Sequence, residues 1–469
     1  MKPKIAIFLS FFFVLSVAAV NPVKVFTDND LLRNANVSIT VKDLNTNKIK
    51  QSFRSKSATI PASTLKLVTT ATALELLGPE FRFNTKLEIE GEISSDSILN
   101  GNLYIRGGGD PTLGSEILGD SDFLSTWVEN VRKAGIKRIN GSIVADANLY
   151  DTEGVNPKWL WEDLGNYYAA GAYGISYKDN TYILKLHSGA VGTTPELLKI
   201  TPEIPGMQFK IYLKSSTITS DSAYIHGEPY SDFRSVYGAI PANKAVFEVK
   251  GDIPRPGLLL AQDFTKKLIQ NGFSVRDAAT DNVTTSRKCT VIYSYRSPEL
   301  RDIIREINVN SNNHYAEQVF RYLSLQNDSV ASSRGAVAVI KNFWKSQLLP
   351  VDELFMYDGS GLSPVDAVSS NFMVNLLAYM EKSRYNADFK ASLAVAGING
   401  TLTSFLKNTA LQGKVQAKSG SIHRVKCYAG YINTDKKKYA FSIMVNNPNA
   451  ATSSSTTKKM EEFLLSVSK

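Results

Sequence analysis

Residues 61–78 read Pro-Ala-Ser-Thr-Leu-Lys-Leu-Val-Thr-Thr-Ala-Thr-Ala-Leu-Glu-Leu-Leu-Gly. A proline opens this stretch and a glycine closes it, which is the arrangement typical of a helix start and a helix end. Between them, apolar and small side chains recur at helical spacing. We therefore predict a helix with one buried stripe and with Ser63 in its first turn. The stripe consists of Leu65, Val68, Thr72 and Leu76.

Alternating apolar and polar residues near both ends of the chain predict two β-hairpins, each with a polar turn. A helix is predicted after the second hairpin, around residues 460–467. Strands from both ends that flank a helical middle predict one antiparallel sheet with helices packed on it, an α/β (α+β) fold. The strand and turn segments are 37–41, 45–48, 425–431, 433–436 and 439–445.

The middle of the chain has a different texture. From residue 86 to residue 257, short β-like runs such as Leu103-Tyr104-Ile105 alternate with Gly, Ser, Asp and Pro turns. This pattern predicts a large β-rich insertion. We expect residues 20–85 and 258–469 to form the domain that carries the chemistry, and residues 86–257 to form one or more inserted accessory domains.

Three short motifs follow one another along the chain: Ser63-Thr64-Leu65-Lys66, Ser311-Asn312-Asn313 and Lys418-Ser419-Gly420. Each motif alone occurs often by chance. Their contexts add information, because the first opens a helix, the second lies in a polar loop and the third leads into an alternating strand. Together they indicate a catalytic site.

The first motif suits nucleophilic catalysis. A serine hydroxyl is a weak nucleophile and needs a base within hydrogen-bond reach. One helical turn places the Lys66 amine beside the Ser63 hydroxyl. Lysine acts as a base only when it is neutral, and a neighbouring cation such as Lys418 would lower its pKa. We therefore predict Ser63 as the nucleophile and Lys66 as its base.

The other motifs suit the remaining steps. We expect Ser311 to relay a proton to the leaving amine and Asn313 to hold the peptide bond of the substrate. Lys418 and Ser419 suit a terminal carboxylate, through charge and a hydroxyl donor. We assign Ser419, Gly420 and Ser421 together to substrate binding, and the backbone N–H groups of Ser63 and Ser421 to an oxyanion hole. The four histidines show no ligand spacing, so we expect no metal, and no motif calls for a cofactor.

This ordered motif set resembles that of penicillin-binding proteins and class A β-lactamases. Five further segments resemble peptidase family S13, the type C low-molecular-mass penicillin-binding proteins known as D-alanyl-D-alanine carboxypeptidase/endopeptidase. The resemblance covers most of the chain after the first twenty residues. The segments are 108–113, 161–164, Asn313 with Ala316-Glu317, 358–363 and 396–402.

The resemblance implies a β-lactamase/transpeptidase-like sheet, with extra domains that emerge just after the nucleophile helix. It implies cleavage of D-Ala-D-Ala and of D,D cross-links in peptidoglycan stem peptides, and covalent inhibition by β-lactam antibiotics. Asp163 matches an acidic residue that meets the amino group of a diamino-acid side chain; the alternative is an ordinary buried or capping Asp. Ser419 stands where the family usually has Thr and keeps the hydroxyl. Residues 358–363 are interpreted as a tight turn.

Two other functions share these motifs. A serine β-lactamase would carry all three, but the long interval from Ser63 to Ser311 argues against it. A catalytically inactive homologue that binds peptidoglycan as a scaffold would not need the intact motif residues. The balance between carboxypeptidase and endopeptidase activity stays open, because both reactions cleave the same D,D bond. The oligomeric state stays open as well.

The N-terminus predicts export. Lys2 and Lys4 precede an apolar run that ends at Ala18-Ala19, the pattern of a cleaved signal peptide. We expect residues 1–19 to be removed and the protein to act in the periplasm or cell envelope. A retained N-terminal anchor is the alternative.

Charge and cysteine content exclude several classes. The formal net charge of +9 fits a soluble, slightly basic surface or attraction to an anionic polymer or membrane, so peripheral membrane association stays open. No basic run interleaved with aromatics indicates nucleic-acid binding. Cys289 and Cys427 are too few for a disulfide framework. We expect two small buried side chains, with a single disulfide as the alternative.

Overall fold

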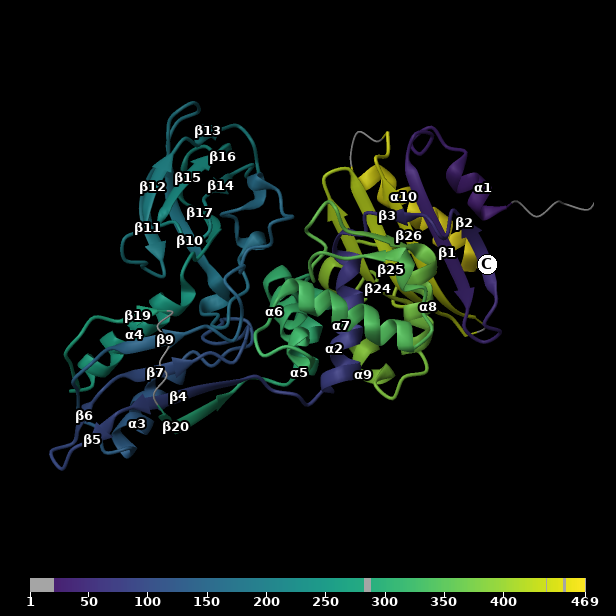
Figure 1. Ribbon diagram of the computed structural model, residues 1–469. Helices are drawn as coiled ribbons and strands as arrows, with labels where there is room; N and C mark the ends of the chain where they lie inside the picture. The colour runs from purple at the N-terminus through teal and green to yellow at the C-terminus, as the bar shows by residue number, and fades with distance from the viewer. Residues whose placement is uncertain (1–20, 282–287, 436, 450–452, 469) are drawn as a thin grey trace, which may run out of the picture.

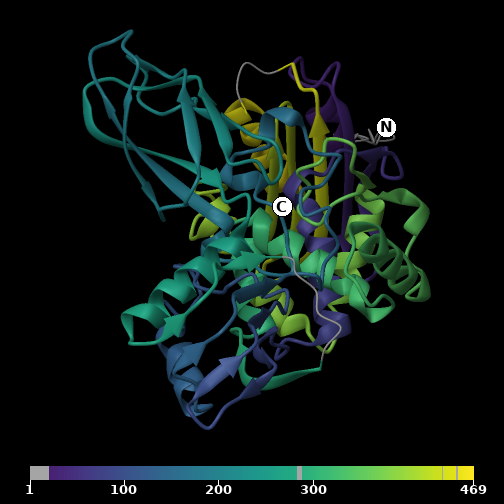
Figure 2. The same ribbon diagram turned by 60° about the vertical axis from the view of Figure 1, so that its left-hand side comes forward.

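The computed structural model describes residues 21–281, 288–435, 437–449 and 453–468 and shows two regions side by side (Figure 1). One region contains both ends of the described chain, and the other, in blue and teal, comes from its middle. Figure 2 shows the same division from another side. The predicted signal peptide, residues 1–19, lies outside the described residues.

A six-stranded antiparallel sheet forms the centre of the first region, which confirms the sheet predicted from the two chain ends. β1 pairs with β26 along its whole length, from Asn36 opposite Asn446 to Asp43 opposite Tyr439. The two ends of the chain thus lie against each other at the middle of the sheet. Its strands, in spatial order, are β2 (Ile49–Phe53), β1 (Asn36–Asp43), β26 (Lys438–Asn446), β25 (Val425–Asn433), β24 (Val415–Ile422) and β23 (Ala394–Val395).

The helix predicted at residues 61–78 is present but begins later than expected. Ala62–Leu65 form a 3₁₀ turn, η1, and α2 (Lys66–Leu77) follows it. Ser63 therefore lies in the turn that precedes the helix. Gly78 ends the helix with a φ of 82°, a conformation that glycine adopts readily. α2 is buried all round for most of its length, and not along one stripe, because other helices surround it.

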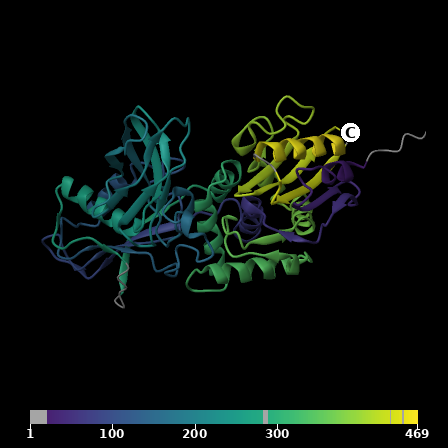
Figure 3. The same cartoon turned by 90° about the horizontal axis from the view of Figure 1, so that it is seen from above.

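Helices cover both faces of the sheet, as the view from above shows (Figure 3). Successive residues of β26 point to opposite faces. Ala440 and Met444 pack with the helices around α2, whereas Phe441 and Ile443 pack with α1 and α10. These helices are α1 (Pro22–Thr27), α5 (Leu300–Val309), α6 (Asn313–Tyr322), α7 (Ser333–Ser346), α8 (Ser370–Met380), α9 (Asn386–Ala391) and α10 (Ser453–Ser468).

One part of the inserted region contains a five-stranded and a four-stranded sheet. Both pack with α3 and α4 around a common core that includes Trp127 and Phe264. The elements are β4 (Asn84–Glu90), β5 (Glu92–Ile93), β6 (Ile98–Asn100), β7 (Leu103–Arg106), α3 (Phe123–Lys133), β8 (Arg138–Ile139), β9 (Ile143–Asp146), α4 (Pro256–Gln270), β18 (Ser274–Val275), β19 (Thr280–Asp281) and β20 (Cys289–Arg296).

The rest of the inserted region consists of three smaller sheets. A buried ion pair of 3.0 Å between Arg234 and Asp252 links two of them. The predicted β-rich character of the insertion is confirmed. The strands are β10 (Thr181–Ser188), β11 (Glu196–Thr201), β12 (Gln208–Ile211), β13 (Lys214–Ser216), β14 (Tyr224–His226), β15 (Phe233–Tyr237), β16 (Ala239–Pro241) and β17 (Lys244–Asp252).

We propose that the inserted region extends to Arg296 and does not end at residue 257. β20 pairs antiparallel with β4 over its whole length, from Cys289 opposite Glu90 to Arg296 opposite Asn84. The chain therefore enters and leaves the inserted region along one two-stranded path.

Cys289 and Cys427 do not form a disulfide with each other, so the alternative of a single disulfide is wrong. Cys427 is buried in β25, whereas Cys289 is half-buried in β20, in the other region. In the part of the chain that the structure describes, no helix combines the length and the apolar character needed to cross a membrane.

Candidate active site

The turn that carries Ser63 is held against strand β24. β3 (Ala58–Thr59) leads into this turn, and η1 places Ser63 just before the first residue of α2. A Cβ atom at Gly420 would lie 2.6 Å from the carbonyl oxygen of Pro61 and 3.1 Å from the backbone nitrogen of Ser63. Only glycine permits this approach of strand and turn.

Lys66 lies directly behind the serine. Its Nζ donates to Ser63 Oγ at 2.9 Å, to Asn313 Oδ1 at 2.6 Å and to the carbonyl oxygen of Ser360 at 2.7 Å. The side chain is fully buried. Burial lowers the pKa of Lys66 to about 7, although the nearby carboxylates of Asp358 and Glu317 oppose this shift. A large share of Lys66 is therefore neutral near pH 7, as a base beside a serine requires.

Ser311 and Asn313 lie at the start of α6, across the site from Ser63. Ser311 adopts a φ of 65°, which is unusual for a non-glycine residue, and its hydroxyl accepts a hydrogen bond from Lys418 Nζ at 2.9 Å. Asn312 caps α6 and accepts from the backbone nitrogen of Tyr315 at 3.0 Å. The cap fixes the helix end that positions Asn313.

The third motif lies on β24. Lys418 is fully buried and also donates to the carbonyl oxygen of Ser419 at 2.8 Å. Burial lowers the pKa of Lys418, and the charges of Lys66 and Lys426 lower it further. The repulsion between the two lysines lowers the pKa of Lys418, whereas burial alone lowers the pKa of Lys66, so the expected effect of Lys418 on Lys66 is not seen. The Ser419 hydroxyl donates to Thr401 Oγ1 at 2.8 Å.

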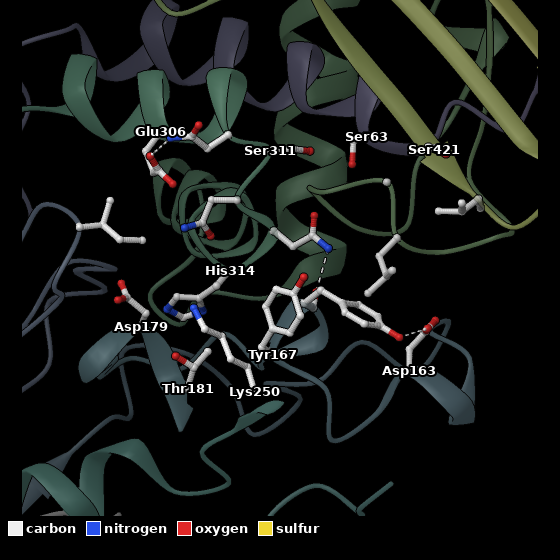
Figure 4. Close-up of a pocket in the computed structure, with 18 of the residues that line it drawn as sticks. Ser63, Asp163, Tyr167, Asp179, Thr181, Lys250, Glu306, Ser311, His314 and Ser421 are labelled. Atoms are coloured by element: carbon white, nitrogen blue, oxygen red, sulfur yellow. Dashed lines mark hydrogen bonds between the residues drawn. The ribbon is translucent and has the colours of Figure 1, made fainter. Parts of the chain in front are cut away.

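A pocket of about 1020 Å³ opens in front of these groups. Its walls include Ser63, Ser311, Asn313, Ser421 and Asp163, so five of the predicted residues share one cavity (Figure 4). The remaining predicted residues do not line this cavity: these are Lys66, Lys418, Ser419 and Gly420.

Asp163 comes from the inserted region, in the 3₁₀ turn η2 (Trp161–Asp163). It is half-buried, and the Tyr168 hydroxyl donates to its Oδ1 at 3.0 Å. Burial raises the pKa of Asp163. The Asn313 amide nitrogen donates to the Tyr168 carbonyl oxygen at 2.8 Å, so one tyrosine joins the inserted wall to the catalytic motif (Figure 4).

Sequence reasoning missed the group of carboxylates behind Lys66. Glu317 Oε1 accepts from the backbone nitrogens of Gly359 and Ser360 at 3.0 and 2.8 Å, and burial raises its pKa to about 8. Asp358 accepts from the backbone nitrogens of Gly361 and Ser363 at 2.7 and 2.8 Å. Residues 358–363 thus form the predicted tight turn.

No sequence signal could have revealed the direct contact of that turn with Lys66, because a backbone carbonyl makes it. Within the described ranges, no group of three or more His, Cys, Asp or Glu side chains is arranged to hold a metal ion.

Comparisons with known proteins identify the family. The model of the family described as D-Ala-D-Ala carboxypeptidase 3 (S13) matches residues 20–467. The D-alanyl-D-alanine carboxypeptidase of Actinomadura sp. (strain R39) is 26% identical over 83% of this chain and 73% of its own length. The D-alanyl-D-alanine carboxypeptidase DacB of Haemophilus influenzae is 25% identical over 92% of this chain and 89% of its own.

A solved structure shows the same fold. The crystal structure of penicillin binding protein 4 (dacB) from Haemophilus influenzae superposes with a TM-score of 0.83, at 22% identity, over 96% of this chain and 98% of the other. Since the family match covers nearly all of the described residues, this chain belongs to the D-Ala-D-Ala carboxypeptidase 3 (S13) family.

Proposed function

We propose that Ser63 is the acylated nucleophile of a serine DD-peptidase that cleaves D-Ala-D-Ala termini and D,D cross-links of peptidoglycan stem peptides. One observation carries this proposal. The buried Lys66 amine, with its pKa lowered to about 7, donates to Ser63 Oγ at 2.9 Å. A base of that pKa at that distance activates a serine hydroxyl near neutral pH.

Acylation takes place in two parts. Lys66 accepts the hydroxyl proton as Ser63 Oγ attacks the scissile carbonyl carbon, and the backbone N–H groups of Ser63 and Ser421 stabilise the oxyanion. The C–N bond then breaks, and the proton that Lys66 accepted passes through Ser311 to the leaving amine, which returns Lys66 to its neutral form. Support for this relay comes from the Lys418–Ser311 hydrogen bond. Water finally attacks the ester, which releases the acid product and restores Ser63.

Other groups orient the substrate. Lys418 binds the terminal carboxylate of the substrate through its charge, and Ser419 binds it through its hydroxyl. Gly420 and Ser421 offer the backbone of β24 to the substrate peptide. Asn313 has two amide hydrogens, of which Tyr168 takes one, so the second is available to the peptide carbonyl of the substrate. Asp163 binds the amino group of a diamino-acid side chain.

The protein acts after export, in the periplasm or cell envelope, because that is where peptidoglycan lies. The signal-peptide pattern of residues 1–19 and the family match, which begins at residue 20, support this location. β-Lactams acylate Ser63, since their carbonyl takes the place of the scissile peptide. For peripheral membrane association, the supporting observation is the basic net charge of the chain.

Labelling with a fluorescent penicillin tests the proposal. Purified protein should release D-Ala from a D-Ala-D-Ala peptide and form a stable penicillin adduct that maps to Ser63. Ser63→Ala should abolish both, whereas Ser360→Ala, which removes a buried hydroxyl nearby, should keep the label. Normal labelling of Ser63→Ala would show that the nucleophile is another residue, and rapid penicillin turnover by the wild type would favour the β-lactamase alternative.

A further inference from the structure

The pocket has two arms that lie on opposite sides of Ser63 and Ser311 (Figure 4). One arm contains Ser421 and Asp163. The other, which we call the far arm, is lined by Glu306, Asp179, Thr181, Lys250 and His314. The proposed mechanism uses nothing in the far arm.

The direction of the substrate assigns the two arms. On the proposed function, the oxyanion donor Ser421 marks the acyl side of the scissile bond. Ser311, the proton relay, marks the side of the leaving amine. The far arm continues past Ser311 and is therefore the space into which the leaving group extends.

The far arm carries groups that a carboxypeptidase does not need. On the proposed function, the leaving group of that reaction is one D-Ala, whose carboxylate meets Lys418 beside Ser311. The whole pocket, both arms together, has a volume of about 1020 Å³, at the upper end of the range that buries a whole drug-sized ligand. One alanine accounts for Ser311 and Lys418 but for none of the residues that line the far arm.

The walls of the far arm carry polar groups of both signs. Glu306 and Asp179 are half-buried acids, and Lys250 on β17 is exposed and makes no ion pair with any described residue. A peptide with free carboxylates, amides and an amine matches such a mixed surface, whereas a purely apolar or purely anionic ligand does not.

His314 supplies an independent sign of a ligand. Its ring is 4% exposed and lies in the pocket wall. The Gly171 backbone is a polar neighbour of the ring, but neither ring nitrogen makes a hydrogen bond of full geometry among the described residues, so at least one nitrogen stays available to a ligand. Burial lowers the pKa of His314 to about 3, so the neutral ring offers one donor and one acceptor. Buried polar groups without a partner are rare and require an explanation.

We propose that the far arm binds the second stem peptide of a cross-link, the one whose side-chain amine is the leaving group. This inference rests on the proposed function and deepens it, because it makes cross-link cleavage a reaction for which the pocket is built. Uncross-linked stems reach only as far as Ser311 and Lys418.

Two variants test the far arm. Thr181→Trp fills it at the start of β10, and Lys250→Glu reverses its exposed charge. Lys244→Glu is the matched control, because it makes the same charge change on the same strand outside the pocket. The measurement is kcat/KM for a cross-linked muropeptide dimer and for an uncross-linked pentapeptide, together with penicillin labelling.

Thr181→Trp should lower kcat/KM for the dimer by about tenfold or more, through a direct clash. Lys250→Glu should lower it by up to about fivefold, as an exposed charge allows. The pentapeptide value and labelling should change less than about twofold, since neither reaches the arm. Lys244→Glu should match the wild type.

Equal losses on both substrates, or an unchanged dimer value in Thr181→Trp, would overturn the inference. Labelling reports whether Thr181→Trp has folded; if it has not, the exposed Lys250→Glu variant decides. A wild type that cleaves neither substrate would instead contradict the proposed function.

Discussion

The pocket lies between two walls: the catalytic wall, formed by the three motifs, and the inserted wall, formed by residues of the inserted region such as Asp163, Tyr167 and Lys250. The two walls differ in how deeply their functional side chains are buried. On the catalytic wall, Lys66 and Lys418 are fully buried and each donates at least two hydrogen bonds. On the inserted wall, residues such as Tyr167, Tyr224 and Lys250 are exposed. Burial lowers the pKa of Lys66 enough to make it a base, which an exposed lysine cannot become. On the proposed function, the catalytic wall supplies the chemistry and the inserted wall supplies selection among substrates.

The largest effect that sharpens this comparison should come from Lys66. Lys66→Ala should lower the rate of acylation by about 10²–10⁴-fold for peptides and penicillin alike, because a general base is lost. Initial binding should change little. Stopped-flow measurement of penicillin acylation separates the two quantities, and the exposed Lys345→Ala on α7 serves as a control. A loss confined to peptide substrates would contradict the role of base.

The second-largest effect is expected for Lys418, which lies on the same wall and is proposed to bind the terminal carboxylate of the substrate through its charge. Lys418→Ala should weaken peptides with a free terminal carboxylate by about 2–5 kcal/mol, as expected for a desolvated pair. An amidated analogue should lose far less, and Lys418→Arg should restore part of the activity. Steady-state kcat/KM on both peptides measures the difference. Equal losses would show that Lys418 acts on the chemistry.

A smaller effect is expected on the inserted wall. Asp163→Asn removes the charge and keeps an acceptor for the Tyr168 hydroxyl. It should lower kcat/KM by about five- to tenfold for peptides that carry a free side-chain amine. Peptides with an acetylated amine, and penicillin, should be unaffected. A comparable loss of penicillin acylation would place Asp163 in the chemistry and would break the division between the walls.

The smallest effect is a shift with pH. Lys66 must be neutral to act, so acylation should fall as the pH drops through about 7. The carboxylate of Glu317 raises the pKa of Lys66, and Glu317→Gln should therefore move this limb to lower pH. We expect less than about one pH unit, since Glu317, whose own pKa is raised to about 8, is itself partly protonated there. Rates of penicillin acylation from pH 5 to 9 measure the limb; a shift to higher pH would reverse the argument.

The sequence predicted those features that depend on spacing along the chain. Ser63 and Lys66 are three residues apart, and helical geometry alone brings them together. Alternation in β1 and β25 showed that strands exist at both chain ends, and few ways remain to pair them. Ser311 and Lys418 were found from the order of motifs, since nothing in their spacing reveals a 2.9 Å contact.

Contacts made by backbone atoms could not be predicted. Lys66 bonds the Ser360 carbonyl and Asn313 bonds the Tyr168 carbonyl, and any residue type offers that oxygen. Strand partners in the insertion were equally hidden, because nothing in the spacing along the chain indicates that β20 pairs with β4. The left-handed backbone of Ser311 has no signal either, since glycine or asparagine is more usual there.

The amide of Asn313 has an evolutionary consequence. Its oxygen faces Lys66 and its nitrogen faces Tyr168, so the side chain is fixed by the catalytic wall on one side and the inserted wall on the other. Excision of the insertion would remove the Tyr168 carbonyl and leave Asn313 held by Lys66 alone. A deletion in the insertion therefore also removes one of the two contacts that fix a motif residue, so the two walls are linked in evolution through this side chain.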